Sequence, residues 1–228
     1  MGLLDLIFPK YCINCKKYGD YLCPNCFAML SFDTTYICTV CGNPSIDGLT
    51  HNQCRTKFSA EGNFTGVVFN PIAKKLIYKF KNKPYLTGLA SFMTNLMYEK
   101  LIQDEQFVNI LKQKPILVPI PITRNTEKKR GYNQSKILAK QLAKKFDLEL
   151  LDSLIRIKET KPQTGLSKKE RRENVANAFF LNPSSIIPKT ILLVDDVLSS
   201  GATMNEAAKV LKSGGTTEIW ALAFAKED

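Results

Sequence analysis

The segment of residues 190–203, with the sequence TILLVDDVLSSGAT, constrains the fold more than any other part of the chain. It begins with the apolar run 191–194, which is typical of a strand buried on both faces. A helical pattern over residues 204–212 follows and stops at Gly214 and Gly215. A buried strand that leads through a short loop into a helix predicts an α/β fold with an open, mostly parallel sheet.

Two acidic residues and a polar loop follow this strand. Asp195 and Asp196 stand at its carboxyl end, where open α/β sheets bind ligands. The loop of residues 198–203 offers three hydroxyl groups, and Gly201 lets the backbone N–H groups converge on an anion at a helix N-terminus. The acids can instead cap the helix, but two adjacent carboxylates repel each other unless a ligand uses them. Carboxylates for sugar hydroxyls beside amides for a phosphate predict a ribose-5-phosphate site.

All seven cysteines and the only histidine precede residue 55. They form four pairs with a two-residue gap, and such a gap lets a tight turn aim both side chains at one metal ion. Eight ligands complete two four-coordinate sites, so we predict two Zn²⁺ ions rather than disulfides, which the odd cysteine count disfavours. The predicted ligands are Cys12, Cys15, Cys23, Cys26, Cys38, Cys41, His51 and Cys54. The spacing leaves both sequential and cross-braced sites open, and the closeness of the first two pairs favours the sequential arrangement.

The composition changes after Ser59, which predicts a zinc-binding module over residues 1–60 and an α/β domain over residues 61–228. Hydrophobic periodicity predicts strands at 64–69 and 115–122 and helices at 73–81, 87–102 and 134–146. Residues 123–133 read as a basic loop between a strand and a helix, a place where α/β folds bind anions. The charged segment 158–178 is a long loop, or a loop followed by a short helix, and is typical of a functional lid.

The chain carries a formal net charge of +11, from 32 basic and 21 acidic residues. The excess can serve solubility alone, but its clustering favours a polyanionic partner. The two clusters are Lys74, Lys75, Lys79, Lys81 and Lys83, and Arg124, Lys128, Lys129 and Arg130. The N-terminal residues resemble neither a secretory signal nor a myristoylation motif, and no uncharged stretch is long enough to span a bilayer. We therefore expect a cytoplasmic protein without membrane insertion.

Several further motifs occur in a fixed order along nearly the whole chain. Paired Cys-x2-Cys units come first, followed by VPIP, by RGYNQ at residues 130–134, by QTGLSKKERRENVANAF at residues 163–179, and by VDDVLSSGAT. In this combination the sequence resembles the type I phosphoribosyltransferases, and within them the ComF/ComFC family of competence-related proteins. Two positions depart from the family pattern. Ser199 and Ser200 stand where relatives often have threonines, and His51 stands where a cysteine is usual.

The resemblance implies a type I phosphoribosyltransferase fold with a small N-terminal zinc module, and phosphoribosyl pyrophosphate with Mg²⁺ as the ligand. Asp195 and Asp196 would hold the ribose hydroxyls as the catalytic residues, and Arg171, Arg172 and Asn174 would lie in a mobile hood. The implied ligand-binding residues are Val194, Asp195, Asp196, Ser199, Ser200, Gly201, Ala202, Thr203 around the ribose 5-phosphate, and Arg130 and Gly131 near the pyrophosphate.

The resemblance also implies a function in natural transformation. The first hypothesis is a DNA-uptake factor that binds phosphoribosyl pyrophosphate and single-stranded DNA and works with other DNA-uptake proteins. Its candidate nucleic-acid residues are Lys79, Lys81, Lys83, Lys128, Lys129, Arg171 and Arg172, with Phe80, Tyr85 and Tyr132 for base stacking. The alternatives are an enzyme that transfers ribose-5-phosphate to an unidentified nucleobase or amine, and a non-catalytic regulator that senses phosphoribosyl pyrophosphate. The sequence shows no general base, so turnover stays open, as does the oligomeric state.

Overall fold

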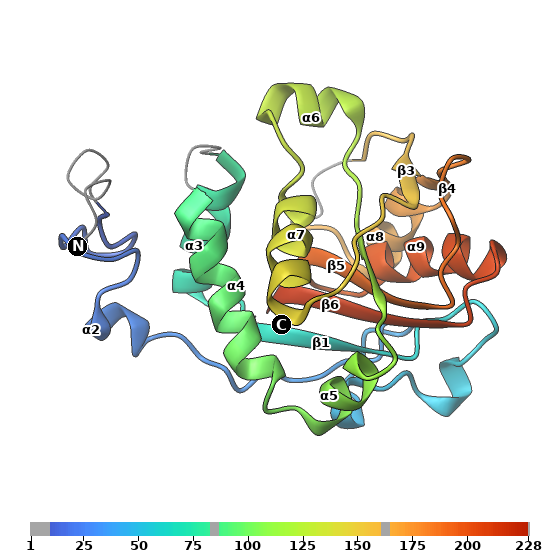
Figure 1. Ribbon diagram of the computed structural model, residues 1–228, viewed down its shortest axis with the longest axis horizontal. Helices are drawn as coiled ribbons and strands as arrows, with labels where there is room; N and C mark the ends of the chain where they lie inside the picture. Colours follow the sequence, from blue (N-terminus) through green and yellow to red (C-terminus); the bar gives the residue numbers. More distant parts are fainter. Residues whose placement is uncertain (1–9, 83–86, 161–164, 228) are drawn as a thin grey trace.

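The core of the molecule is a four-stranded parallel sheet with the strand order β1-β6-β5-β2. Figure 1 labels the strands β1, β6 and β5 of this sheet. The computed structural model describes residues 10–82, 87–160 and 165–227. The strands of the sheet are β1 (Gly62–Val68), β2 (Ile116–Pro119), β5 (Thr190–Leu198) and β6 (Glu218–Lys226). The parallel sheet confirms the predicted α/β class. One difference concerns β5, which continues through Asp195 and Asp196 to Leu198 instead of ending at residue 194, because it stays hydrogen-bonded to β6 over that length.

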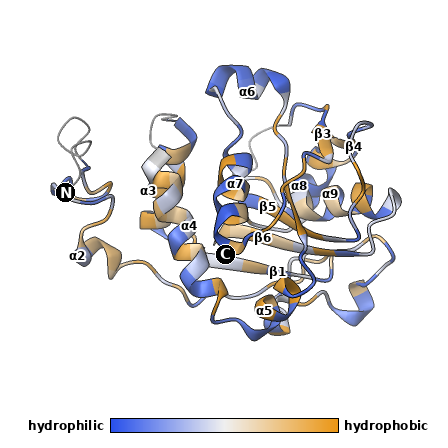
Figure 2. Ribbon diagram, viewed as in Figure 1, coloured by the Kyte–Doolittle hydropathy of each residue, from blue (hydrophilic) through white to orange (hydrophobic). Residues whose placement is uncertain are grey.

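Helices cover both faces of the sheet because its strands are apolar on both sides. In β5, Leu192 and Val194 belong to one buried cluster, whereas Ile191 and Leu193 belong to the other. The first face packs against α3 (Pro71–Asn82), α4 (Thr87–Leu101), α5 (Glu105–Leu111) and α7 (Gln134–Phe146). The second face packs against α9 (Ala202–Ser213) and a two-stranded antiparallel sheet of β3 (Leu154–Arg156) and β4 (Phe179–Leu181). The hydrophobic colouring of the central strands follows this double burial (Figure 2).

Two short polar helices form in segments for which the sequence predicted a loop or left a loop and a short helix as alternatives. The predicted basic loop after β2 is wrong over residues 124–130, where the chain forms α6 (Arg124–Arg130). Thr123 caps its N-terminus, and Gly131 ends it with a φ of 87°. Its hydrophilic residues project from the body of the molecule (Figure 2). The charged segment 158–178 contains α8 (Lys168–Val175), which begins with a capping box between Ser167 and Glu170.

The N-terminal segment contains the short helix α2 (Pro24–Phe27) and two 3-10 turns, η1 (Ile46–Gly48) and η2 (Asn52–Cys54). Residues 10–30 lie beside α3 and α4 (Figure 1), and Lys75 Nζ of α3 donates to Asn14 Oδ1 at 2.7 Å. The chain then runs along the outer side of β1, where the Val68 N–H donates to the Ser31 carbonyl at 2.8 Å. The N-terminal segment therefore covers the free edge of the sheet. Within the described ranges, no helix has the length and apolar character that a membrane span requires.

Candidate functional site

A cavity of about 510 Å³ opens where β5 meets the loop before α9. Its walls also include residues of α3, α6 and α7, together with the segment after β3. Of the residues predicted to bind a ribose phosphate, the lining contains Arg130, Asp195, Asp196, Ser199, Gly201, Ala202 and Thr203. Val194, Ser200 and Gly131 do not reach the cavity. Val194 is buried within the strand directly before the two acids.

The two acids are held in different ways. Asp195 Oδ1 accepts hydrogen bonds from Ser135 Oγ at 2.7 Å and from the Asp196 N–H at 2.8 Å. Asp196 lies 2.5 Å from Lys81 Nζ, and its side chain is only 5% exposed. Burial, and next the charge of Asp196, raises the pKa of Asp195 to about 7. Burial opposes ionisation of Asp196 as well, but the Lys81 ammonium group outweighs it and lowers the pKa of Asp196. The pair therefore carries one firmly ionised carboxylate and one that titrates near neutral pH.

The loop of residues 199–203, called the phosphate loop below, turns the chain from β5 into α9. Gly201 is the N-cap of α9 and has a φ of 78°, a left-handed conformation that side chains rarely adopt. The first-turn N–H groups of a helix have no partner within the helix, so the start of α9 presents donors to an anion. The Ser200 hydroxyl is buried and has no hydrogen-bond partner among the described residues.

The cavity also contains an arginine and a glutamate that the sequence reasoning missed. Arg156 comes from β3, donates to Thr160 Oγ1 at 2.5 Å, and lies 5.4 Å from the centre of the Phe179 ring. Burial lowers the pKa of Arg156, and its Nε has no partner within the described part of the chain. Glu159 accepts a hydrogen bond from Thr123 Oγ1. The cavity therefore holds the cations of Lys81, Arg130 and Arg156 around its acids.

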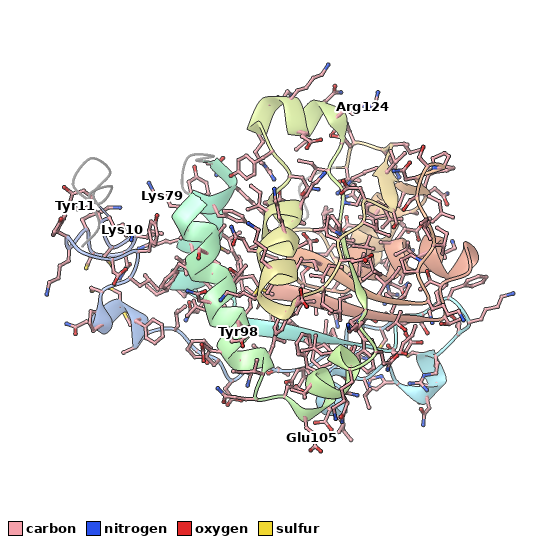
Figure 3. The ribbon with its side chains drawn as sticks, viewed as in Figure 1. Lys10, Tyr11, Lys79, Tyr98, Glu105 and Arg124 are labelled. Atoms are coloured by element: carbon pink, nitrogen blue, oxygen red, sulfur yellow. The ribbon has the colours of Figure 1, made fainter. Side chains whose placement is uncertain are left out.

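The residues predicted to bind nucleic acid do not form one surface. Lys81 lines the cavity, whereas Lys128 and Lys129 are exposed on α6. Lys79 lies on α3 toward the segment that carries Lys10 and Tyr11, and Arg124 lies at the outer side of α6 (Figure 3). Lys83 and Tyr85 fall outside the described residues.

The two hood arginines are engaged in contacts within the protein. Arg171 pairs with Glu227 at 3.2 Å, and Arg172 donates to the Val40 carbonyl at 2.7 Å. The expectation that Phe80 stacks on bases is wrong, because this residue is 3% exposed and belongs to the apolar stripe of α3. Tyr132 is partly buried, and its hydroxyl donates to the Phe80 carbonyl.

The cysteines and the histidine gather into two groups whose ligand atoms all lie within 4.8 Å of one another. The first cluster is Cys12, Cys15, Cys23 and Cys26, and the second cluster is Cys38, Cys41, His51 and Cys54. This is the sequential arrangement. Four thiol or imidazole donors at this separation fit a closed tetrahedral Zn²⁺ site.

Both clusters show further features of zinc ligation. His51 Nδ1 lies 3.4 Å from Cys41 Sγ, and Nε2 lies 3.0 Å from the Pro44 carbonyl oxygen. A zinc-binding imidazole commonly donates its second N–H to a carbonyl in this way. In the first cluster, burial alone would raise the pKa of Cys12, but backbone N–H groups of the turn lower it to about 6. The turn around Cys12 is therefore suited to hold a thiolate, and the second cluster has the carbonyl contact that a zinc-binding imidazole commonly makes.

Two known domain families match parts of the chain. Residues 3–55 match the double zinc ribbon domain, and residues 133–227 match the phosphoribosyl transferase domain. Competence protein F of Haemophilus influenzae is 35% identical over 153 residues, 65% of this chain and 65% of that protein. Competence protein ComFC of Bacillus subtilis is 27% identical over 87% of this chain and 81% of its own length. DNA utilization protein YhgH of Escherichia coli O157:H7 is 26% identical over 95% of this chain and 98% of its own length. The fold is therefore a phosphoribosyltransferase domain that follows a zinc-binding module.

Proposed function

We propose that the chain, whose relatives include competence proteins F and ComFC, is a member of the ComF/ComFC family that binds phosphoribosyl pyrophosphate and single-stranded DNA in the cytoplasm during DNA uptake. One observation carries the ligand assignment. The acids at the end of β5 and the start of α9 line the same cavity, which combines acceptors for ribose hydroxyls with donors for a 5-phosphate. The names of three relatives, two competence proteins and a DNA utilization protein, support the biological setting.

Each part of the proposed ligand has a chemical counterpart in the cavity. The ionised Asp196 and the titrating Asp195 accept hydrogen bonds from the ribose hydroxyls. The phosphate loop receives the 5-phosphate. Arg130 and Arg156 offer guanidinium groups to the diphosphate, because their planar donors suit phosphate oxygens. Mg²⁺ is proposed to bind mainly through oxygens of the ligand, since this ion keeps several waters and few protein ligands.

Calorimetric titration with phosphoribosyl pyrophosphate and Mg²⁺ tests this assignment. We expect the wild-type protein to bind, and the double variant Asp195→Asn/Asp196→Asn to lose binding while it keeps its circular dichroism spectrum. The control is Asp152→Asn, which removes a carboxylate from an exposed ion pair with Lys136 outside the cavity. Wild-type protein that gives no heat of binding, or a double variant that binds as tightly as the wild type, would refute the ligand assignment.

Exposed basic residues on α3 and α6 support the proposal of DNA binding. Lys74 and Lys75 are exposed on α3, and Lys128 and Lys129 are exposed on α6. Both helices also contribute a cation to the cavity, Lys81 and Arg130. A single strand that follows these two helices would therefore pass the mouth of the ribose-phosphate site, and its phosphates would meet positive charge on both sides.

Salt-dependent binding of a fluorescent oligothymidine tests the DNA surface. We expect Lys128→Glu/Lys129→Glu to weaken binding and to reduce the slope of log affinity against log salt by about 0.7 for each phosphate that the variant no longer neutralises. The control Lys140→Glu/Lys144→Glu makes the same change of net charge on exposed positions of α7. Equal losses of affinity in the two variants would show that only net charge matters and would contradict a DNA surface on α6.

A second candidate is transfer of the ribose-5-phosphate group, and the additional cations of the cavity favour it. In such a transfer the bond between the anomeric carbon and pyrophosphate breaks, a nucleobase or amine nitrogen bonds to that carbon, and the acceptor loses a proton. Arg130 and Arg156 are placed to stabilise the leaving pyrophosphate. Acceptor-dependent release of pyrophosphate would support the enzyme, whereas binding with neither turnover nor DNA affinity would favour a regulator that senses the ligand.

A further inference from the structure

The backbone of the second cluster lies directly against the phosphate loop. A Cβ atom built on Gly201 would lie 2.3 Å from the Thr39 carbonyl oxygen and 2.8 Å from its Cα atom. Thr39 stands between the ligands Cys38 and Cys41. On the other side of the contact, a Cβ atom on Gly42 would lie 3.2 Å from the Ser200 carbonyl oxygen. Only glycine therefore permits this approach at position 201, where the two backbones meet without an intervening side chain.

The same turn also holds α8, the helix of the predicted hood. Lys168 Nζ donates to the Gly42 carbonyl at 2.9 Å, and Arg172 donates to the Val40 carbonyl at 2.7 Å. From α8, Arg171 reaches Glu227, which lines the cavity. Residues 39–42 thus contact the phosphate loop and α8, whose Arg171 pairs with Glu227 of the cavity.

The turn is held by its ligands, by its own backbone and by contacts with the α/β domain, where Asn63 Nδ2 donates to the Ile37 carbonyl at 2.6 Å. Thr39 Oγ1 also lies 3.4 Å from Thr50 Oγ1. The Gly42 N–H donates to the Cys38 carbonyl at 2.8 Å, and the Cys38 N–H donates to the Asn43 carbonyl at 2.9 Å. The nearest regular elements in sequence are two three-residue 3-10 turns. Because the segment has only these short elements, we expect metal binding to contribute to the free energy that fixes its conformation, beside its packing against the α/β domain.

The first cluster has different neighbours. Its turn contacts α3 through Asn14 and Lys75, and Tyr21 lies against Gly88 at the start of α4. The side chains of Tyr11 and Tyr18 pack against each other and remain half exposed. None of the contacts described for this turn involves the phosphate loop or α8. The chain therefore offers an internal comparison between two similar metal sites.

We infer that the second cluster is a positioning element of the ribose-phosphate site, so that zinc at this cluster, and not at the first, sets the affinity for the ligand. The inference rests on the proposed function. Loss of this zinc releases the turn of residues 38–42, and with it the contact that places Gly201 and the start of α9. The residues of this cluster would act through the backbone of Thr39, which lies against Gly201.

Matched single-ligand variants test the inference. Cys41→Ser and Cys15→Ser each remove the second cysteine of a Cys-x2-Cys pair, from the second and the first cluster respectively. Zinc content identifies which metal is absent, and circular dichroism checks the fold. We expect the dissociation constant for phosphoribosyl pyrophosphate to rise about tenfold in Cys41→Ser, which corresponds to about 1.4 kcal/mol, and by less than about twofold in Cys15→Ser.

A measurement made without ligand distinguishes a change in the conformation of the phosphate loop from a change in its direct contacts with the ligand. Hydrogen exchange of the amides of residues 201–204 should be faster in Cys41→Ser than in either Cys15→Ser or the wild type. If Cys41→Ser does not fold, Gly42→Asn provides a second variant. Asparagine tolerates the left-handed conformation of Gly42, whose φ is 71°, while its Cβ atom presses on the Ser200 carbonyl and leaves the zinc ligands in place.

The outcomes distinguish this inference from the proposed function. Wild-type protein that does not bind phosphoribosyl pyrophosphate refutes the proposed function, while faster exchange confined to the second-cluster variant still supports the structural coupling. Wild-type binding that is unchanged in folded Cys41→Ser, together with unchanged exchange in the phosphate loop, overturns the inference alone. Equal losses of affinity in Cys41→Ser and Cys15→Ser overturn it as well, since they would reflect general destabilisation.

Discussion

Replacing Asp195 with asparagine isolates the energetic effect of ionising this side chain. Asparagine keeps the Oδ1 acceptor that Ser135 Oγ and the Asp196 N–H use. The pKa of Asp195 is raised from 3.8 to about 7, mainly by burial. The folded protein therefore binds more protons than the unfolded chain between these values, and the free energy of unfolding of the wild type falls as the pH rises from about 4 to about 7. The variant does not undergo this decrease.

The magnitude follows from the size of the shift. The rise in the pKa of Asp195 from 3.8 to about 7 corresponds to about 4 kcal/mol, of which about 3 kcal/mol develops between pH 5 and pH 8. Because Asp195 is partly exposed to water in the cavity, solvent screening reduces this effect. We therefore expect the difference in free energy of unfolding between Asp195→Asn and the wild type to increase by about 1 to 2 kcal/mol, in favour of the variant, from pH 5 to pH 8. Asp196, whose pKa is lowered, stays ionised throughout and does not contribute to the change.

Urea unfolding at pH 5 and pH 8, followed by circular dichroism, measures this difference. Each variant is compared with the wild type at the same pH, so that other titrating groups, including the zinc ligands, cancel. The exposed Asp152→Asn variant should show a difference that does not change with pH. If the advantage of Asp195→Asn is constant, or if the wild type is the more stable protein at pH 8, the assigned ionisation of Asp195 is incorrect.

Three further predictions concern the metal clusters and the cavity. His51→Ala should lower the zinc content from two equivalents to one by mass spectrometry, and unchanged stoichiometry would remove His51 from the ligand set. Gly201→Ala should destabilise the protein by about 3 kcal/mol in urea, because Ala must adopt a φ of 78° and would collide with Thr39; a change below about 1 kcal/mol would contradict this close approach. Lys81→Met should lower the free energy of unfolding by about 2 kcal/mol at pH 7, because it leaves the Asp196 carboxylate unpaired. This loss of stability should shrink toward pH 4, as Asp196 of the variant becomes protonated. A loss that does not depend on pH would indicate poorer packing instead.

The regular elements were predictable where hydrophobic periodicity decides the structure. The helix predicted for residues 134–146 has those bounds in the structure, because its apolar positions repeat at helical spacing and Asn133 caps its N-terminus. The end of β5 was not predictable from composition, since Asp195 and Asp196 are polar but stay in the strand through pairing with β6. Helix α6 has no apolar stripe, so only its caps, Thr123 and Gly131, mark it in the sequence.

The candidate site was predictable where its residues are adjacent in sequence. Asp195, Asp196 and the phosphate loop form one contiguous motif, so their joint position follows from local structure. Arg156 and Glu159 belong to a three-residue strand and the segment after it, and only tertiary packing brings them to the cavity. Lys81 was predicted to contact nucleic acid because it lies in a basic run, whereas its partner in the structure is Asp196, more than 100 residues further along the chain.

The pairing of β1 with β6 has a consequence for the order in which the chain folds. The edge strand β1 comes from residues 62–68 and its partner β6 pairs through residues 220–226, so the sheet cannot be completed until almost the whole chain has left the ribosome. The two zinc clusters, by contrast, use ligands that are close in sequence and precede residue 55. Contacts of short sequence separation form early, whereas pairing between distant strands is slow. We therefore expect the zinc module to fold during synthesis and to cover the outer edge of β1 before its partner strand β6 has been synthesised.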